Sequence, residues 1–241
     1  MTGFSPTAVG DDQRGHIVQV AARLLNERGA SGLTTRGVAD AAGVQPPAIY
    51  RLFGDKDGLI EAVAEQVMAE HVTTKSAVAG SVDPVEALRR GWRLQIEFGL
   101  ANPDLHALLN APGRAQRSPA IQAGIEVLRG RVRALAAAGL LRVSEIRALG
   151  LIHAAGAGAV VALLEVAPEE RDPGLSDDLL DAVLTQILEP NAAENPDGSG
   201  PSSTAVAVTF AAHIPSLPAL TTAERTLLTE WVGRSIVAAQ R

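Results

Sequence analysis

The chain has 241 residues, of which 46% are apolar and only 3% aromatic, and it contains no cysteine. This length suits one or two domains, and we expect two. The low aromatic content favours helices over sheets, and the lack of cysteine excludes disulfides and thiolate metal sites.

The formal net charge of −6 is spread unevenly along the chain. Residues 1–60 carry six basic and six acidic side chains, whereas residues 61–241 carry fifteen basic and twenty-one acidic ones. The acidity therefore belongs to the larger part. The neutral N-terminal part lacks the surplus of positive charge that marks many nucleic-acid-binding domains, so charge alone does not indicate DNA.

The first predicted helix follows a loose N-terminal arm. Residues 1–10 show no helical pattern, and Asp11 or Asp12 is suited to cap the helix after them. Gly29 offers a left-handed stop at its other end. The apolar residues between these points recur with the spacing of an amphipathic helix, at Ile17, Val20, Ala21, Leu24 and Leu25.

Three more helices are predicted before residue 70. Thr34 is a good N-cap for a short second helix that ends at Gly43. A third helix runs over Pro46–Phe53, because proline is tolerated in the first helical turn, where amide protons have no intrahelical partner. Asp55 caps a fourth helix.

The remainder of the chain keeps the same helical rhythm. Residues 205–213 and 222–239 show helical patterns near the C-terminus, and residues 190–203 are rich in proline, glycine and serine, which predicts a mobile loop. We find no convincing strand, so the sequence predicts an all-α fold. The other predicted helices begin near Pro84, Asp104, Pro119, Ser144 and Ser176.

The longest apolar run, residues 148–164, is at the lower limit of length for a membrane span. It is mostly alanine and glycine and contains His153, so we expect a buried helix and no membrane insertion. The first 14 residues lack the basic and apolar regions of an export signal, so we expect a cytoplasmic protein.

Residues 34–53 meet the physical requirements of a helix-turn-helix unit. Such a unit consists of two short helices that are joined by a tight glycine turn. Gly43 supplies the positive φ of the turn, and Ala39 lets the two helices approach each other. In units of this kind, the second helix enters the major groove with its N-terminal residues toward the base edges.

The segment from residue 17 to residue 59 resembles the N-terminal domain of TetR-family regulators. Its four blocks follow in order and at tight spacing: AARLLNERG, LTTRGVADAAGV, AIYRLF and DKDGL. The resemblance implies a DNA-binding domain with an N-terminal arm over residues 1–60 and a helical effector-binding and dimerisation domain over residues 61–241. It implies no catalytic site, metal or cofactor. The implied function is that of a repressor that a small molecule releases from a double-stranded DNA operator.

The resemblance also assigns two kinds of DNA contact. Phosphate contacts fix the register of a protein on DNA, whereas base contacts specify sequence. The positions that match phosphate-contacting residues are Thr34, Thr35, Gln45, Tyr50 and Lys56. The positions that face the bases or the groove are Arg36, Pro46, Pro47 and Arg51. For Tyr50, the alternative to a DNA contact is a half-buried place in the core. For Lys56, the alternative is a solvated side chain that does not contact DNA.

Two positions depart from the family pattern. Leu52 stands where many members have histidine or an aromatic residue, and Gln45 replaces the commoner serine or threonine. Pro46 and Pro47 leave few polar side chains to read bases. Apolar contacts with thymine methyl groups and indirect readout are therefore expected to carry more of the specificity than usual.

After residue 69 the chain matches no pattern residue by residue, so its role is argued from physical requirements. Specific binding by a helix-turn-helix normally needs two recognition helices about 34 Å apart. We therefore expect a homodimer through the helices near 144–164 and 176–188. Gly150, Ala154 and Gly158 lie on one face of the helix, and their small size would let a partner helix come close. Packing within one chain is an alternative explanation for this row of small residues.

An effector pocket is expected between the helices that begin near Pro84, Asp104 and Pro119, because ligand cavities are mostly apolar with a few polar groups. Each candidate lining residue also has a simpler explanation as plain core. No charged cluster is visible in the sequence, which favours a largely apolar or neutral effector. The candidate residues are Trp92, Gln95, Phe98, His106 and His153.

Two other functions compete with this interpretation. An all-α enzyme would need a recognisable nucleophile, metal motif or phosphate loop, and none is visible. A ligand-independent architectural DNA-binding protein is the stronger alternative. It would lack a pocket and would stay on DNA in the presence of any small molecule.

Overall fold

The structure is a computed structural model that describes residues 6–75, 83–111, 118–190 and 202–239. Within these ranges the regular elements are helices, and no sheet is formed, which confirms the predicted all-α fold. The chain divides into two compact units. Unit 1 comprises Met1–Ala79 and Phe98–Gly124, and unit 2 comprises Gly80–Glu97 and Ile125–Arg241.

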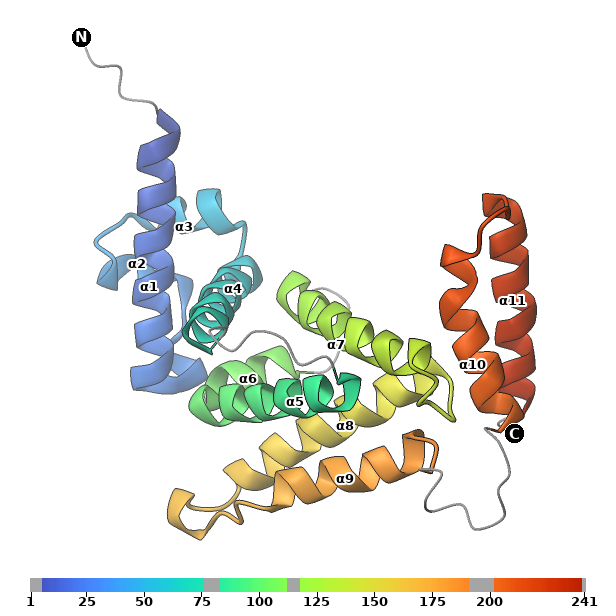
Figure 1. The fold of residues 1–241 in the computed structure, drawn as a ribbon. Helices are drawn as coiled ribbons and strands as arrows, with labels where there is room; N and C mark the ends of the chain where they lie inside the picture. The colour runs from blue at the N-terminus through green and yellow to red at the C-terminus, as the bar shows by residue number, and fades with distance from the viewer. Residues whose placement is uncertain (1–5, 76–82, 112–117, 191–201, 240–241) are drawn as a thin grey trace. The chain divides into compact units, whose positions relative to one another are not determined.

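Unit 1 is built around its first helix. This helix packs against its neighbours α2, α4 and α6, and α3 packs between α2 and α4 (Figure 1). The end of α5 and the start of α7 complete the unit. The helices are α1 (Pro6–Gly32), α2 (Thr35–Ala41), α3 (Pro46–Phe53), α4 (Lys56–Lys75), α5 (Pro84–Ala101), α6 (Pro103–Leu109) and α7 (Pro119–Ala137).

The core of unit 1 is mostly aliphatic. The apolar stripe of α1 is fully or almost fully buried, and so are apolar side chains from α2, α3 and α4. Burial of one such side chain contributes about 1.5–3 kcal/mol. The core therefore fixes α2 and α3 against a common support. Its members include Ile17, Ala21, Leu24, Leu25, Val38, Ala39, Ile49, Leu59, Ile60, Val63 and Leu105.

The prediction of a loose arm is wrong for residues 6–10, whereas residues 1–5 lie outside the described residues. The prediction of the first cap is also wrong. The structure begins α1 at Pro6, so Asp11 and Asp12 lie inside the helix and do not cap it. Proline is well suited to a first helical turn, because it has no amide proton to leave unbonded. At the other end, Gly29 has φ of 68° and interrupts the helix, as expected.

Unit 1 also differs from the expected domain over residues 1–60. Its α4 continues through residue 60 to Lys75, and α6 belongs to the same unit. Glu61 of α4 accepts a hydrogen bond of 2.7 Å from the hydroxyl of Ser118, which is 1% exposed. The Ser118 hydroxyl in turn accepts from the amide of Ile121 at 3.2 Å, so one buried serine joins α4 to the first turn of α7.

In its described part, unit 2 contains the rest of α5 and α7 and four further helices. Its α8 and α9 pack against each other, and α10 and α11 pack as a hairpin (Figure 1). Two short 3-10 segments, Pro168–Glu170 and Ile214–Ser216, follow α8 and α10. The additional helices are α8 (Glu145–Leu164), α9 (Leu175–Ile187), α10 (Ser203–His213) and α11 (Thr222–Ala239).

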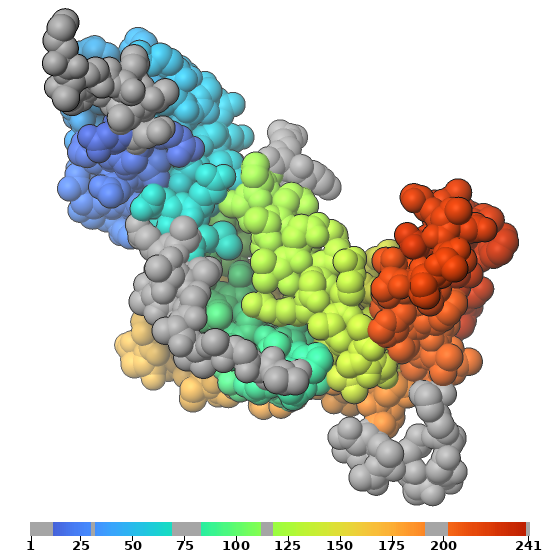
Figure 2. All heavy atoms as spheres, turned by 45° about the horizontal axis from the view of Figure 1, so that its top comes forward, coloured from blue at the N-terminus to red at the C-terminus, as the bar shows by residue number. Residues whose placement is uncertain are grey.

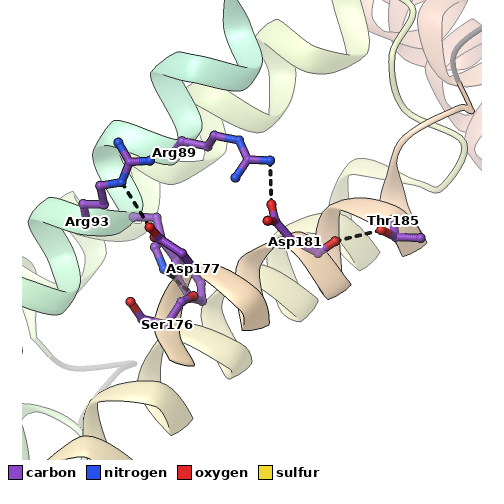
Figure 3. A network of polar contacts seen from close by, with 7 residues as sticks. Arg89, Arg93, Ser176, Asp177, Asp181 and Thr185 are labelled. Carbon is purple, nitrogen blue, oxygen red and sulfur yellow. Dashed lines mark hydrogen bonds and ion pairs between the residues drawn. The ribbon is translucent and has the colours of Figure 1, made fainter. Parts of the chain in front are cut away.

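A polar network fixes α5 to α9 within unit 2 (Figure 3). Trp92 is 4% exposed, and its indole N–H donates to the carbonyl oxygen of Ser176 at 3.0 Å. Two arginines of α5 form ion pairs with α9 on the same side. The pairs are Arg89–Asp181, at 2.5 Å, and Arg93–Asp177, at 3.6 Å.

The start of α9 differs from the sequence prediction. Gly174 takes the N-cap position, and Ser176 lies inside the helix. The side chain of Asp172 accepts from the amide of Gly174 at 2.8 Å, and this turn starts the helix before the serine is reached. Ser144 does cap α8 as predicted, since its hydroxyl accepts from the amide of Arg147 at 3.3 Å.

The predicted mobile loop over residues 190–203 lies mostly outside the described residues. The chain is described again from residue 202, and Ser202 caps α10 by accepting from the amide of Ala205 at 3.1 Å. At the next helix, Thr221 and Glu224 form a reciprocal capping box. The backbone amide of Thr221 bonds the Glu224 carboxylate and lowers its pKa.

Among the described helices, α8 alone is long and apolar enough to cross a membrane by length and composition. Only 33% of its apolar window is buried. A helix of this kind also occurs in proteins that never enter a bilayer, because it can pack against other protein surfaces. One face of α8 packs on α9, and the other remains open.

Candidate DNA-binding interface

The helix-turn-helix unit begins at a side-chain cap. Thr34 has extended backbone angles, and its hydroxyl oxygen accepts from the amide of Gly37 at 3.0 Å. This bond satisfies one of the amides that the first turn of α2 leaves without a helical partner. The predicted N-cap is thus confirmed, and α2 buries Val38 and Ala39 against α1.

The turn between α2 and α3 depends on one glycine. Gly43 has φ of 67°, in the left-handed region where other residues are strained. The amide of Val44 donates to the carbonyl oxygen of Ala39 at 3.0 Å and closes the turn. Pro46 and Pro47 then begin α3, as the sequence predicts. The turn therefore fixes the orientation of α3 relative to α2.

Ile49 anchors α3 in the core, while Pro47, Tyr50 and Arg51 of the same helix are exposed. Ile49 is 0% exposed and points into the core of unit 1, while Leu52 and Phe53 are half-buried against it. Figure 2 shows the light-blue atoms of this segment on the surface of the unit. The leading end of α3 is therefore accessible, as a recognition helix requires.

The predicted DNA-contacting residues all lie on this helix-turn-helix unit or beside it. Tyr50 is 54% exposed, so it is not a core tyrosine. Thr35 and Pro46 are half-buried. The other predicted residues are exposed: Thr34, Arg36, Gln45, Pro47, Arg51 and Lys56. The structure thus leaves each of them a path to solvent, and their individual contacts with DNA stay predictions.

Two of these residues are close enough to act together. The hydroxyl groups of Thr35 and Tyr50 lie 3.4 Å apart, so the start of α2 and the middle of α3 present neighbouring hydroxyls. Hydroxyl groups of this kind commonly donate to phosphate oxygens. Lys56 adds a positive charge in the first turn of α4. Asp55 caps that turn by accepting from the amide of Gly58 at 2.8 Å.

The structure adds two residues of α1 that the sequence analysis does not single out. The side-chain oxygen of Gln13 accepts from Arg51 at 3.4 Å. The guanidinium of Arg14 lies 5.4 Å from the centre of the Phe53 ring, at cation–π distance. Both contacts join α1 to the end of α3. They depend on how the two helices pack, which no local sequence pattern reveals.

The predicted effector-binding residues are divided between the two units. Phe98 and His106 are buried in unit 1, whereas Trp92, Gln95 and His153 belong to unit 2. In unit 2, Trp92 is buried, but Gln95 and His153 are exposed. Burial lowers the pKa of His106, because it disfavours the charged form of the ring. Their role in binding an effector stays a prediction.

Comparison with known proteins identifies the N-terminal domain. The family model of bacterial regulatory proteins of the tetR family matches residues 17–63. The tetracycline repressor protein class A of Escherichia coli is 47% identical over 57 residues, which is 24% of this chain and 26% of the repressor. The regulator BetI of Burkholderia cenocepacia is 34% identical over 79 residues, 32% of this chain and 41% of BetI.

The alignments with curated relatives therefore span less than half of those proteins. Solved structures extend the likeness in fold. A TetR-family regulator from Shewanella sp. PV-4 matches with a TM-score of 0.58 and 17% identity, over 74% of this chain and 99% of the other. A TetR variant from Acinetobacter baumannii, solved with minocycline, matches with a TM-score of 0.55 and 26% identity, over 71% and 94%. Residues 17–63 therefore form a helix-turn-helix domain of the tetR family of bacterial regulatory proteins.

Proposed function

We propose that this protein is a cytoplasmic transcriptional repressor that binds operator DNA as a homodimer and is released by a small, largely apolar effector. One observation carries the DNA-binding part. The leading end of α3 is open, and the predicted phosphate-contacting residues surround it on a rigid support. This arrangement suits a helix that lies in the major groove while its neighbours contact the backbone.

The dimer rests on α8. Its open face carries small residues and two large apolar ones, Ile146 (83% exposed) and Val161 (48% exposed). A methyl group placed on Gly150 or Gly158 would contact nothing within 4 Å. Close approach by a second helix would therefore be unobstructed and would bury apolar surface that water otherwise covers.

Lys56→Ala is expected to weaken binding to every operator sequence by about tenfold and to leave sequence preference unchanged. The lysine is exposed in the first turn of α4, where a phosphate contact would contribute to affinity but not to base readout. Each lost phosphate contact should reduce the slope of log affinity against log salt concentration by about 0.9. Fluorescence anisotropy on DNA fragments selected from a random pool measures both quantities.

The matched control is Lys75→Ala, which makes the same change at the other end of α4, about 28 Å along the helix axis. It should leave the salt slope as it is in the unaltered protein. An unchanged slope in Lys56→Ala would mean that Lys56 is merely solvated. Failure of the unaltered protein to select any DNA would refute the proposed function itself.

Effector release requires that the small molecule prefers the DNA-free state. Minocycline and choline are suitable first probes, because a TetR structure from Acinetobacter baumannii contains minocycline and a transcriptional regulator from Saccharomonospora viridis with a similar fold contains choline. A true effector should bind the free protein about 5–150-fold more tightly than the protein–operator complex. Calorimetric titration with and without operator measures this ratio. A ratio of one for a compound that binds would exclude it as an effector, and failure of all tested compounds to release DNA would favour the ligand-independent architectural alternative.

A further inference from the structure

Two arginines of unit 2 lie near each other, and neither is paired with a carboxylate among the described residues. Arg90 is on α5 and Arg131 is on α7, and both are half-buried. Within the described part of the chain, no carboxylate forms an ion pair with either of them. Arginines close to them in sequence are all paired with carboxylates: Arg89 with Asp181, Arg93 with Asp177, Arg129 with Glu126 and Arg133 with Glu145.

A glycine makes room for one of the two guanidinium groups. A methyl group placed on the buried Gly91 would overlap the guanidinium of Arg131, and it would lie only 2.8 Å from Nε. The Arg131 side chain therefore lies directly against the backbone of α5, next to Arg90. Glycine inside a helix is less favourable than alanine. This unfavourable glycine lies at the point where α5 and α7 bring the two arginines together. Figure 2 shows these two helices side by side, in green and yellow-green.

The two positive charges of Arg90 and Arg131 are not neutralised by an acidic side chain among the described residues. Burial lowers the pKa of Arg131, and the positive charge of Arg90 lowers it further. Removing a charge from water without pairing it is unfavourable, and a second like charge nearby adds to the cost. An anion bound to both guanidinium groups would relieve both costs. A guanidinium holds its N–H donors in a planar fork that fits the oxygens of a carboxylate or phosphate.

The surroundings of the two arginines are mixed in character. Val127 lies one turn before Arg131 on α7 and is 55% exposed. Leu94 lies one turn after Arg90 and is half-buried, and Gln95 lies one turn after Gly91 and is exposed. Residues four apart share one face of a helix. A ligand with an anionic head at the arginines would therefore find apolar surface and one amide within a helical turn.

We propose that Arg90 and Arg131 form a binding site for the carboxylate or phosphate group of a small molecule with an apolar body. Naming that molecule as the effector rests on the proposed function, but the site itself does not. The proposal amends the expectation of an effector without charge. The sequence shows no charged cluster because the two arginines are 41 positions apart, and only the packing of α5 on α7 brings them together.

The test is calorimetric titration of the DNA-free protein with octanoate and, separately, with inorganic phosphate, at constant ionic strength set by sodium chloride. At least one of the two should bind the unaltered protein. Arg131→Gln and Gly91→Ala should each weaken that binding by about tenfold or more, because the first removes the guanidinium and the second displaces it. Arg133→Gln is the matched control on α7, since Arg133 is exposed and already paired with Glu145.

The outcomes separate the alternatives. Binding of octanoate alone assigns a carboxylate ligand, and binding of phosphate alone assigns a phosphate ligand. The proposal is overturned if neither anion binds, if Arg131→Gln binds as well as the unaltered protein, or if Arg133→Gln loses binding equally. Arg131→Gln should also melt no lower than the unaltered protein without ligand, because it removes an unpaired charge. A lower melting temperature together with retained anion binding would show that Arg131 is structural.

Operator binding by the unaltered protein, measured without any anion, tests the proposed function separately. If operator binds but neither anion does, only the anion site is refuted. If an anion binds but no DNA does, the proposed function fails and the site stands. An anion that binds at the arginines and leaves the operator complex intact would refute its role as the effector.

Discussion

Ala154→Glu is expected to leave the protein monomeric and to lower its affinity for operator DNA by about a thousandfold. Ala154 is exposed on α8, between Gly150 and Gly158. In a two-fold symmetric dimer, each substitution meets the same surface of the partner, so two carboxylates would be placed in one apolar contact. Removing such charges from water without pairing them prevents close packing of the helices.

The effect on DNA follows from the loss of the second recognition helix. When one recognition helix of a dimer is bound, the other is held near its half-site at a high effective concentration. A monomer binds each half-site independently and loses this gain. Sedimentation velocity gives the oligomeric state, and anisotropy with full-site and half-site DNA gives the two affinities. The full-site affinity of the variant should fall to near that of a half-site.

The control for this experiment is Ala123→Glu, the same change on an exposed position of α7. Both substitutions replace a good helix former by another, so neither should unfold the chain. The control should remain dimeric. If Ala154→Glu also remains dimeric, α8 does not form the dimer contact. The small residues on its open face must then be explained by packing within one chain.

The sequence predicts those parts of the fold that depend on neighbouring residues. Thr34, Asp55 and Ser144 are confirmed as caps, because a cap bonds an amide only three residues away. The prediction fails at Ser176, where the turn at Asp172 acts earlier in the chain. It also fails at residues 6–10, which belong to a helix that begins at Pro6 and not to the expected arm.

The candidate sites differ in how far the sequence could reveal them. The helix-turn-helix is contiguous, so its residues are recognisable in one segment. Gln13 and Arg14 join it only through the packing of α1 beside α3. The pair Arg90 and Arg131 depends entirely on tertiary structure, and so does the division of the predicted effector residues between two units. Contacts between distant residues are set by helix packing, which periodicity alone does not determine.

Ile49→Ala is expected to destabilise unit 1 by about 2–5 kcal/mol and to reduce DNA binding at physiological temperature. Among the described side chains of α3, Ile49 alone is fully buried. Its truncation removes apolar contacts with the core and leaves a cavity that a helix of eight residues, Pro46–Phe53, is too short to fill by shifting. Because no side-chain cap bond holds the N-terminal end of α3, the buried Ile49 is its main apolar anchor.

Urea unfolding followed by circular dichroism measures the loss, and amide exchange in α1, α3 and α4 shows where it falls. Both tryptophans, Trp92 and Trp231, lie in unit 2, so their fluorescence reports that unit and not α3. Leu52→Ala is the control, since Leu52 is only half-buried and its truncation should cost less. Equal losses for the two variants, or faster exchange confined to unit 2, would show that Ile49 does not anchor the recognition helix.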